Sequence, residues 1–181
     1  MSCLKNFWVA GNYIATYKIP VDTVNPEAPI TNQATITKLT YDGVIFKGYQ
    51  LQVPFYYGPY IPPAGDFDEE SDTLTYYKDF TLQYQSGGQY GTQWGKWQKK
   101  GDKISTSFWG SGPEGTKIIM KVVVQKLQSG YRIVTYFKER LNCKWTLTND
   151  LTLSKPLLGG GSAPEELTTN TKSGNGFFGL F

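Results

Sequence analysis

Arg132, Glu139 and Asn149 are the residues near the C-terminal end of the chain whose types best suit ligand chemistry. An arginine that points into the interior could hold a carboxylate or propionate group through two parallel hydrogen bonds. Asn149 lies on the apolar side of an alternating segment, and a buried amide must bond either a ligand or the backbone at a bulge. We therefore expect Arg132 or Asn149 to anchor a ligand. The alternative for the charged residues is a solvent-facing position on an edge strand.

The absence of histidine removes several classes of catalytic site. The sequence has no His and 2 Cys, so Ser-His-Asp catalysis, Cys-His catalysis and a cysteine-based zinc site are excluded. We expect Cys3 and Cys143 to be reduced thiols. The acidic run over residues 66–72 lacks the spacing of an EF-hand loop, which favours a solvated loop and no metal site. No nucleophile and base pair is evident, so whether the protein is an enzyme stays open.

Aromatic residues are the second notable feature, with 13 Tyr, 10 Phe and 5 Trp. Such residues favour strands and can stack on a flat, conjugated ligand. We expect Trp94, Trp97, Trp109 and Trp145 to line a pocket, and ordinary core packing is the alternative for each of them.

Residues 117–153 indicate how these side chains are positioned. Apolar and polar residues alternate with a period of two in three consecutive segments, which is typical of strands with one apolar face. The alternation points Met120 and Asn149 inward, together with Cys143, Trp145 and Leu147. Short turns near residues 128–130 and 140–142 join the three segments into antiparallel hairpins.

Six further strands are predicted from similar patterns and from turn residues, and they cover residues 12–19, 34–41, 44–53, 73–85, 89–98 and 103–109. A meander of eight or nine strands exposes its edges unless it closes, so we expect an all-β, antiparallel, up-and-down barrel. A two-sheet sandwich is the competing architecture. Residues 1–156 form the single predicted domain, and residues 157–181 a flexible tail.

Two segments could bind a protein partner. The long loop over residues 54–72 carries Tyr56, Tyr57 and Tyr60, and the tail ends with Phe177, Phe178 and Phe181. The net charge of +3 is too small to indicate nucleic-acid binding, and no segment is apolar enough for a membrane span or a signal peptide. We therefore expect a soluble protein of a reducing compartment, either cytoplasm or plastid stroma.

The segment around Gly11 and Tyr13 resembles the opening of a lipocalin-like (calycin) barrel. That family begins its first strand with Gly-x-Trp; here Gly11 matches and Tyr13 stands at the place of the tryptophan. The resemblance implies a barrel that binds an apolar or conjugated small molecule in its interior.

Within that superfamily, the last strands resemble the S-type phycobiliprotein lyases, which attach linear tetrapyrroles to light-harvesting proteins. The similar residues are Thr135-Tyr136, Glu139-Arg140, Trp145 and the segment 149–153, although their spacing differs. The resemblance implies a linear tetrapyrrole (bilin) ligand and a role as chromophore chaperone or lyase.

Together these observations predict a ligand-binding set, which consists of Tyr13, Trp109, Met120, Arg132, Tyr136, Glu139, Trp145 and Asn149. No cofactor is identified beyond the hydrophobic ligand. The rival hypothesis is a structural or assembly subunit, such as a viral or phage component, that acts through the 54–72 loop and the tail.

Overall fold

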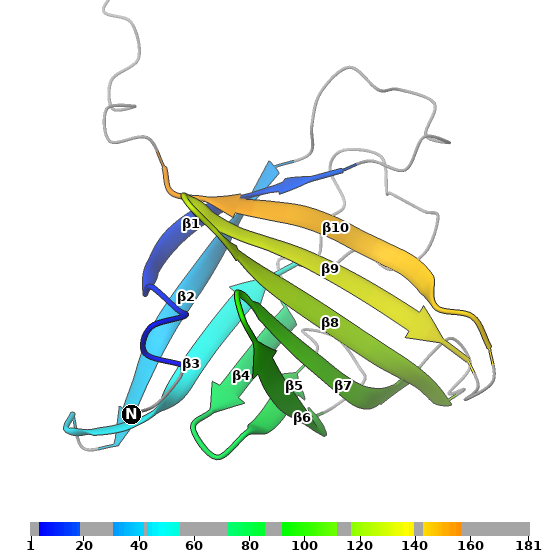
Figure 1. The fold of residues 1–181 in the computed structure, drawn as a ribbon, viewed down its shortest axis with the longest axis horizontal. Coiled ribbons are helices and arrows are strands. Elements are labelled where there is room, and N and C mark those ends of the chain that lie inside the picture. Colours follow the sequence, from blue (N-terminus) through cyan, green and yellow to red (C-terminus); the bar gives the residue numbers. More distant parts are fainter. Residues whose placement is uncertain are drawn as a thin grey trace, which may run out of the picture.

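The computed structural model describes residues 4–18, 31–41, 43–54, 72–85, 92–111, 117–139 and 143–156. These residues form ten antiparallel strands that close into one barrel (Figure 1). The strands are β1 (Gly11–Tyr17), β2 (Thr31–Tyr41), β3 (Ile45–Val53), β4 (Asp72–Tyr77), β5 (Thr81–Gln85), β6 (Thr92–Lys100), β7 (Lys103–Ser111), β8 (Lys117–Leu127), β9 (Gly130–Lys138) and β10 (Thr146–Ser154).

The predicted all-β, up-and-down barrel is confirmed. Every strand pairs with its neighbours in sequence, and β1 pairs with β10 to close the ring. The sandwich alternative is therefore wrong, because no free sheet edge remains among the described strands. In the described part of the chain, no helix has the length and apolarity needed to span a membrane.

One hairpin was not predicted, which is why the barrel has ten strands and not eight or nine. Residues 73–85 form two strands, β4 and β5, joined by a turn at residues 78–80. The Asp79 carboxylate accepts a hydrogen bond from the Thr81 amide at 3.0 Å, and Phe80 adopts a positive φ of 69°. The turn contains no glycine or proline, so nothing in the sequence interrupts the strand pattern of residues 73–85.

The end of the barrel that carries the tight turns is closed by residues 4–8, which we call the N-terminal turn. The amides of Phe7 and Trp8 both donate to the Leu4 carbonyl at 3.1 Å, which forms a single turn. Leu4, Phe7 and Trp8 are buried, and the Trp8 ring packs against Tyr76 and Tyr131 at centroid distances of 5.2 and 5.0 Å. Aromatic side chains therefore fill this end of the interior.

Tyr131 fastens the N-terminal turn to β9. Its hydroxyl donates to the Phe7 carbonyl at 3.0 Å and accepts from the Val9 amide at 2.7 Å. The Tyr13 hydroxyl adds a bond to the Val9 carbonyl at 2.8 Å. Burial raises the pKa of Tyr131, so its hydroxyl stays protonated and can donate at neutral pH.

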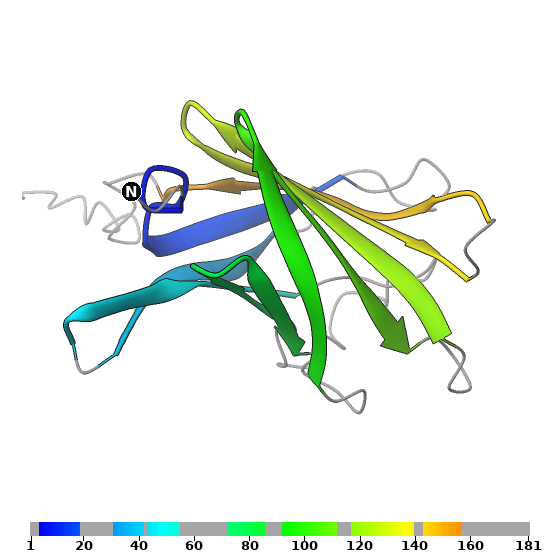
Figure 2. The ribbon, with the colours of Figure 1, turned by 60° about the horizontal axis from the view of Figure 1, so that its bottom comes forward.

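The two ends of the barrel differ. The short connections between β2 and β3, β4 and β5, β6 and β7, and β8 and β9 all lie at the end with the N-terminal turn, which we call the closed end (Figure 2). At the far end, the strands lead to residues outside the described ranges. The 54–72 loop between Pro54 and Asp72, and the tail over 157–181, also lie outside the described residues.

Candidate functional site

The structure does not bring the eight predicted site residues together. Three of them are buried on the inner side of the barrel, namely Tyr13, Met120 and Asn149. Trp109 and Trp145 are exposed, Arg132 and Tyr136 are half-buried, and Glu139 is exposed directly after β9. The alternation along the strands explains why only some of these residues are buried. The neighbours of Trp109, Arg132 and Tyr136 along their strands face the core, so these three side chains face outward.

A β-bulge moves Trp145 and Leu147 to the outside. Leu147 pairs with Tyr136 and Asn149 pairs with Thr135, so the register between β10 and β9 shifts at Thr148. One extra residue in a strand moves the side chains that precede it to the opposite face of the sheet. Trp145 is 39% exposed and Leu147 is 55% exposed, and the prediction that they face inward with Asn149 is wrong.

The four tryptophans that were expected to line a pocket do not come together in one place. Only Trp97 among the four is buried, and its indole N–H donates to the Tyr77 carbonyl at 2.9 Å. Trp94 stacks on Tyr77 with an interplanar angle of 20°, and it remains exposed on the outer wall. The interior aromatic cluster is instead built mainly from tyrosines and from the N-terminal turn.

A pocket lies on the outside of the barrel, over β7, β8 and β9, and we call it the outer pocket. Its volume is about 260 Å³. Val123 of β8 and Val134 of β9 are directly paired and contribute its apolar lining. The remaining lining residues are Lys103, Lys121, Gln125, Arg132, Tyr136 and Trp145, so three of the eight predicted site residues do meet here.

Trp145 is held at this pocket by two lysines. The Lys138 ammonium lies 4.7 Å from the centroid of its ring, and the Lys121 ammonium lies 5.7 Å away. Ammonium groups at such distances are attracted by the negative face of an indole. The two cations therefore favour this position of the ring, although Trp145 precedes the first residue of β10.

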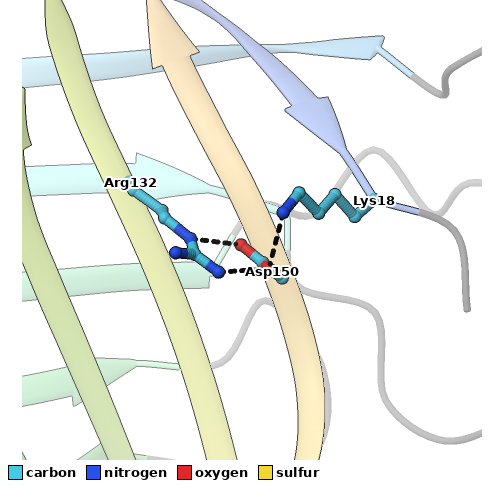
Figure 3. Close-up of polar contacts among 3 residues, drawn as sticks. All are labelled: Lys18, Arg132 and Asp150. Carbon is cyan, nitrogen blue, oxygen red and sulfur yellow. Dashed lines mark hydrogen bonds and ion pairs between the residues drawn. The ribbon is translucent and has the colours of Figure 1, made fainter.

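Arg132 is oriented by Asp150 of the neighbouring strand (Figure 3). Its Nε donates to Asp150 Oδ1 at 2.9 Å and its Nη2 donates to Oδ2 at 2.7 Å, which is a bidentate pair. Lys18 lies 3.5 Å from the same carboxylate. Hydrogen bonding from Arg132 is the main cause that lowers the pKa of Asp150, and the same contact raises the pKa of Arg132.

The electrostatic character of the outer pocket is cationic. The described residues that line it include Lys103, Lys121 and Arg132 and no acidic residue. Asp150 offsets the charge of Arg132, but its carboxylate oxygens are engaged by Arg132 and Lys18, and its side chain is only 12% exposed. An anionic group that enters the pocket therefore meets two further lysines.

The barrel interior contains polar atoms that are not satisfied. Among the described residues, the Trp8 indole N–H and the hydroxyls of Tyr76 and Thr135 are buried without a hydrogen-bond partner. Burial raises the pKa of Tyr76, so this hydroxyl is a neutral donor. Buried polar groups normally have partners, so these atoms could accommodate water or a polar ligand.

Several predicted features cannot be placed. Tyr56, Tyr57, Tyr60, Phe177, Phe178 and Phe181 lie outside the described residues. No group of three or more potential metal ligands occurs within the described ranges. Cys143 is exposed and has a free thiol.

The valines and lysines of the outer pocket were not singled out from the sequence. The signal was present in the alternation, which placed Lys121 and Gln125 on the polar face of one strand and Arg132, Val134 and Tyr136 on that of the next. Apolar residues on a polar face, such as Val134, were the indication that part of this face is covered.

Comparison with protein-family models, with curated proteins and with solved structures gives no match to this chain. The closed antiparallel barrel is compatible with a lipocalin-like fold, and no relative supports either the lipocalin family or its lyase branch.

Proposed function

We propose that this protein is a binding module whose outer pocket holds a small molecule with a flat apolar body and one anionic group. The observation that carries the proposal is the meeting of paired valines, an indole ring in contact with two lysines, and three cations in one pocket. The valines and Trp145 suit a flat apolar body. Lys103, Lys121 and Arg132 suit a carboxylate, sulfonate or phosphate.

The volume limits the size of the ligand. At about 260 Å³, the outer pocket lies just below the range of roughly 300 to 1,000 Å³ that is usual for small-molecule sites. A molecule of one or two fused rings fits this space. A larger molecule would place only one end in it.

Arg132 supplies preorganisation. The Nε and Nη2 atoms of Arg132 donate to the Asp150 carboxylate, so the guanidinium plane is fixed before a ligand arrives. A fixed donor loses less conformational entropy on binding than a free side chain. Arg132 is therefore the residue that we expect to select ligand geometry, and the flexible lysines add charge.

A linear tetrapyrrole belongs to this chemical class, because it combines conjugated rings with propionate groups. Its length exceeds the outer pocket, so one ring and one propionate would be held there. A chromophore carrier is thus the more specific form of the proposal, and biliverdin belongs in any ligand screen.

The test is an equilibrium titration with 2-naphthoate, followed by quenching of tryptophan fluorescence. Replacing the carboxylate by the neutral amide, 2-naphthamide, should weaken binding about tenfold, because charged hydrogen bonds contribute roughly 1.5 kcal/mol or more. Trp145→Ala and Lys121→Gln should each weaken 2-naphthoate binding several-fold. The matched controls Trp94→Ala and Lys96→Gln, which change the outer wall of β6, should not.

A second candidate function is binding inside the barrel, which the unsatisfied atoms of Trp8, Tyr76 and Thr135 favour. Met120→Trp would fill the interior and should abolish such binding while leaving the outer pocket unchanged. Retained binding of an apolar probe such as retinol in Met120→Trp would count against the interior site.

A further inference from the structure

The tip of the β2–β3 hairpin exposes an apolar surface at the closed end. Val44 is 85% exposed, Tyr41 is 56% exposed and Ile45 is 55% exposed. We call these three residues the hairpin tip. Figure 2 shows this hairpin, in cyan, extending past the N-terminal turn and away from the other strands. Large apolar side chains grouped in this way on a protruding hairpin usually mark an interaction site.

One lysine contacts the hairpin tip and two others lie on segments near it. The Lys47 ammonium lies 5.5 Å from the centroid of the Tyr41 ring, and the Lys5 ammonium lies 5.2 Å from that of Phe46. Lys78 is adjacent, since its amide donates to the Lys47 carbonyl at 2.9 Å. Lys47 therefore places a cation at the hairpin tip itself, and Lys5 and Lys78 lie on neighbouring segments of the closed end.

The same charge continues around the closed end. Its strand ends, turns and flanking residues carry eight exposed lysines, which are Lys5, Lys38, Lys47, Lys78, Lys99, Lys100, Lys103 and Lys155. The described acidic residues there are Asp79 and Asp102, and Asp42 lies outside the described residues. Among the described residues of the closed end, exposed lysines therefore outnumber acidic residues by eight to two.

We propose that the closed end docks on the surface of an anionic lipid bilayer, with the hairpin tip inserted among the headgroups and the surrounding lysines on lipid phosphates. Apolar residues that enter the interface and cations that meet anionic lipids are the two components of peripheral membrane binding. Duplex nucleic acid would satisfy the lysines but would leave Val44 and Ile45 in water. The lipid surface is the occupant that uses both features.

The test is co-sedimentation of the full chain with lipid vesicles. Vesicles of phosphatidylcholine with about 30% phosphatidylserine should bind the protein, and vesicles of phosphatidylcholine alone should bind it much more weakly. The double variant Val44→Ser/Ile45→Ser should lower the partition coefficient roughly tenfold or more. Lys47→Gln and Lys78→Gln should lower it about fivefold each.

Matched controls are available elsewhere on the barrel. Leu147→Ser removes an apolar side chain that is as exposed as that of Ile45, at 55%. Lys117→Gln and Lys144→Gln remove exposed lysines near the ends of strands at the far end. None of these three substitutions should change vesicle binding, and circular dichroism should show the same β spectrum for all variants.

The proposal is overturned by any of three results. The first is no binding to anionic vesicles. The second is that Val44→Ser/Ile45→Ser binds anionic vesicles as well as the wild type does. If the protein also binds duplex DNA equally well, the closed end is a general surface for polyanions. The third is an equal loss in the far-end controls. These results are separate from the fate of the outer pocket, which the 2-naphthoate titration reports independently of lipid.

Discussion

Removing the Tyr131 hydroxyl tests how the N-terminal turn is held in the barrel. In Tyr131→Phe the ring stays in the aromatic cluster, and two hydrogen bonds are lost, one to the Phe7 carbonyl at 3.0 Å and one from the Val9 amide at 2.7 Å. Phe7 is buried, so its carbonyl is left unpaired, which costs about 1 to 3 kcal/mol. Val9 is 43% exposed, so water can replace the bond to its amide at little cost.

We therefore expect Tyr131→Phe to lower the free energy of unfolding by about 2 kcal/mol. With a urea dependence of about 2 kcal/mol per molar, the midpoint of urea unfolding should fall by about 1 M. Tyr136→Phe is the matched control, because Tyr136 is half-buried on the outer wall, and its effect should stay within about 0.5 kcal/mol. Equal midpoints for wild type and Tyr131→Phe would refute the account of how the turn is fastened.

The same variant has a signature at alkaline pH. Burial raises the pKa of Tyr131, so the folded state keeps this proton to higher pH than the unfolded state does. The wild type should therefore lose stability as the pH rises above about 10, the ordinary pKa of tyrosine. Tyr131→Phe should lose less stability over the same pH range. Part of the loss that remains comes from Tyr76, because burial raises its pKa as well.

Two further predictions concern Asp150 and the glycines of the barrel. Asp150→Asn should cost about 1 to 2 kcal/mol at pH 7, because it removes a bidentate but partly exposed pair with Arg132. The pKa of Asp150 is lowered in the folded state, so this stabilisation is present above about pH 3.9 and is lost as the pH falls through the lower folded value. Urea unfolding across pH should show the two proteins converge in acid; a constant difference would contradict the pairing. Gly48→Ala should cost about 3 kcal/mol or more, because its Cβ would lie 2.1 Å from the Tyr76 carbonyl oxygen, while Gly101→Ala, with a φ of +60° and open space, should cost about 1 kcal/mol. Similar melting temperatures for the two glycine variants would show that β3 and β4 can separate locally.

The alternation of apolar and polar residues was sufficient to predict the strands of the barrel and, for most strands, which side chains face the interior. Met120, Val122 and Val124 face the core as their spacing indicated, because a strand buried on one face has little other choice. The turn at residues 78–80 was missed since it depends on an aspartate side chain and a strained Phe80. The alternation put the lysines and Arg132 on the polar face, so the expectation of an inward-pointing Arg132 that holds a ligand in the interior is wrong. Alternation alone does not show which of these residues share a pocket.

The errors in the candidate site have one main physical origin. The bulge at Thr148 leaves no clear trace in the pattern of apolar residues, yet it moves Trp145 and Leu147 from the inner to the outer side. The N-terminal turn is the other surprise, because a short segment without strand or helix periodicity supplies Leu4, Phe7 and Trp8 to the core. Long-range contacts of this kind are not encoded in local spacing.

The face on which a ligand binds can be measured directly with nuclear Overhauser effects between 2-naphthoate and valine methyl groups. Val123 and Val134 line the outer pocket, whereas Val122 and Val124 lie on the same strand as Val123 and face the core. We predict contacts from the naphthalene ring to Val123 and Val134 and none to Val122 or Val124. Contacts to the inward pair alone, or no contacts with 2-naphthoate in excess, would contradict binding at the outer pocket.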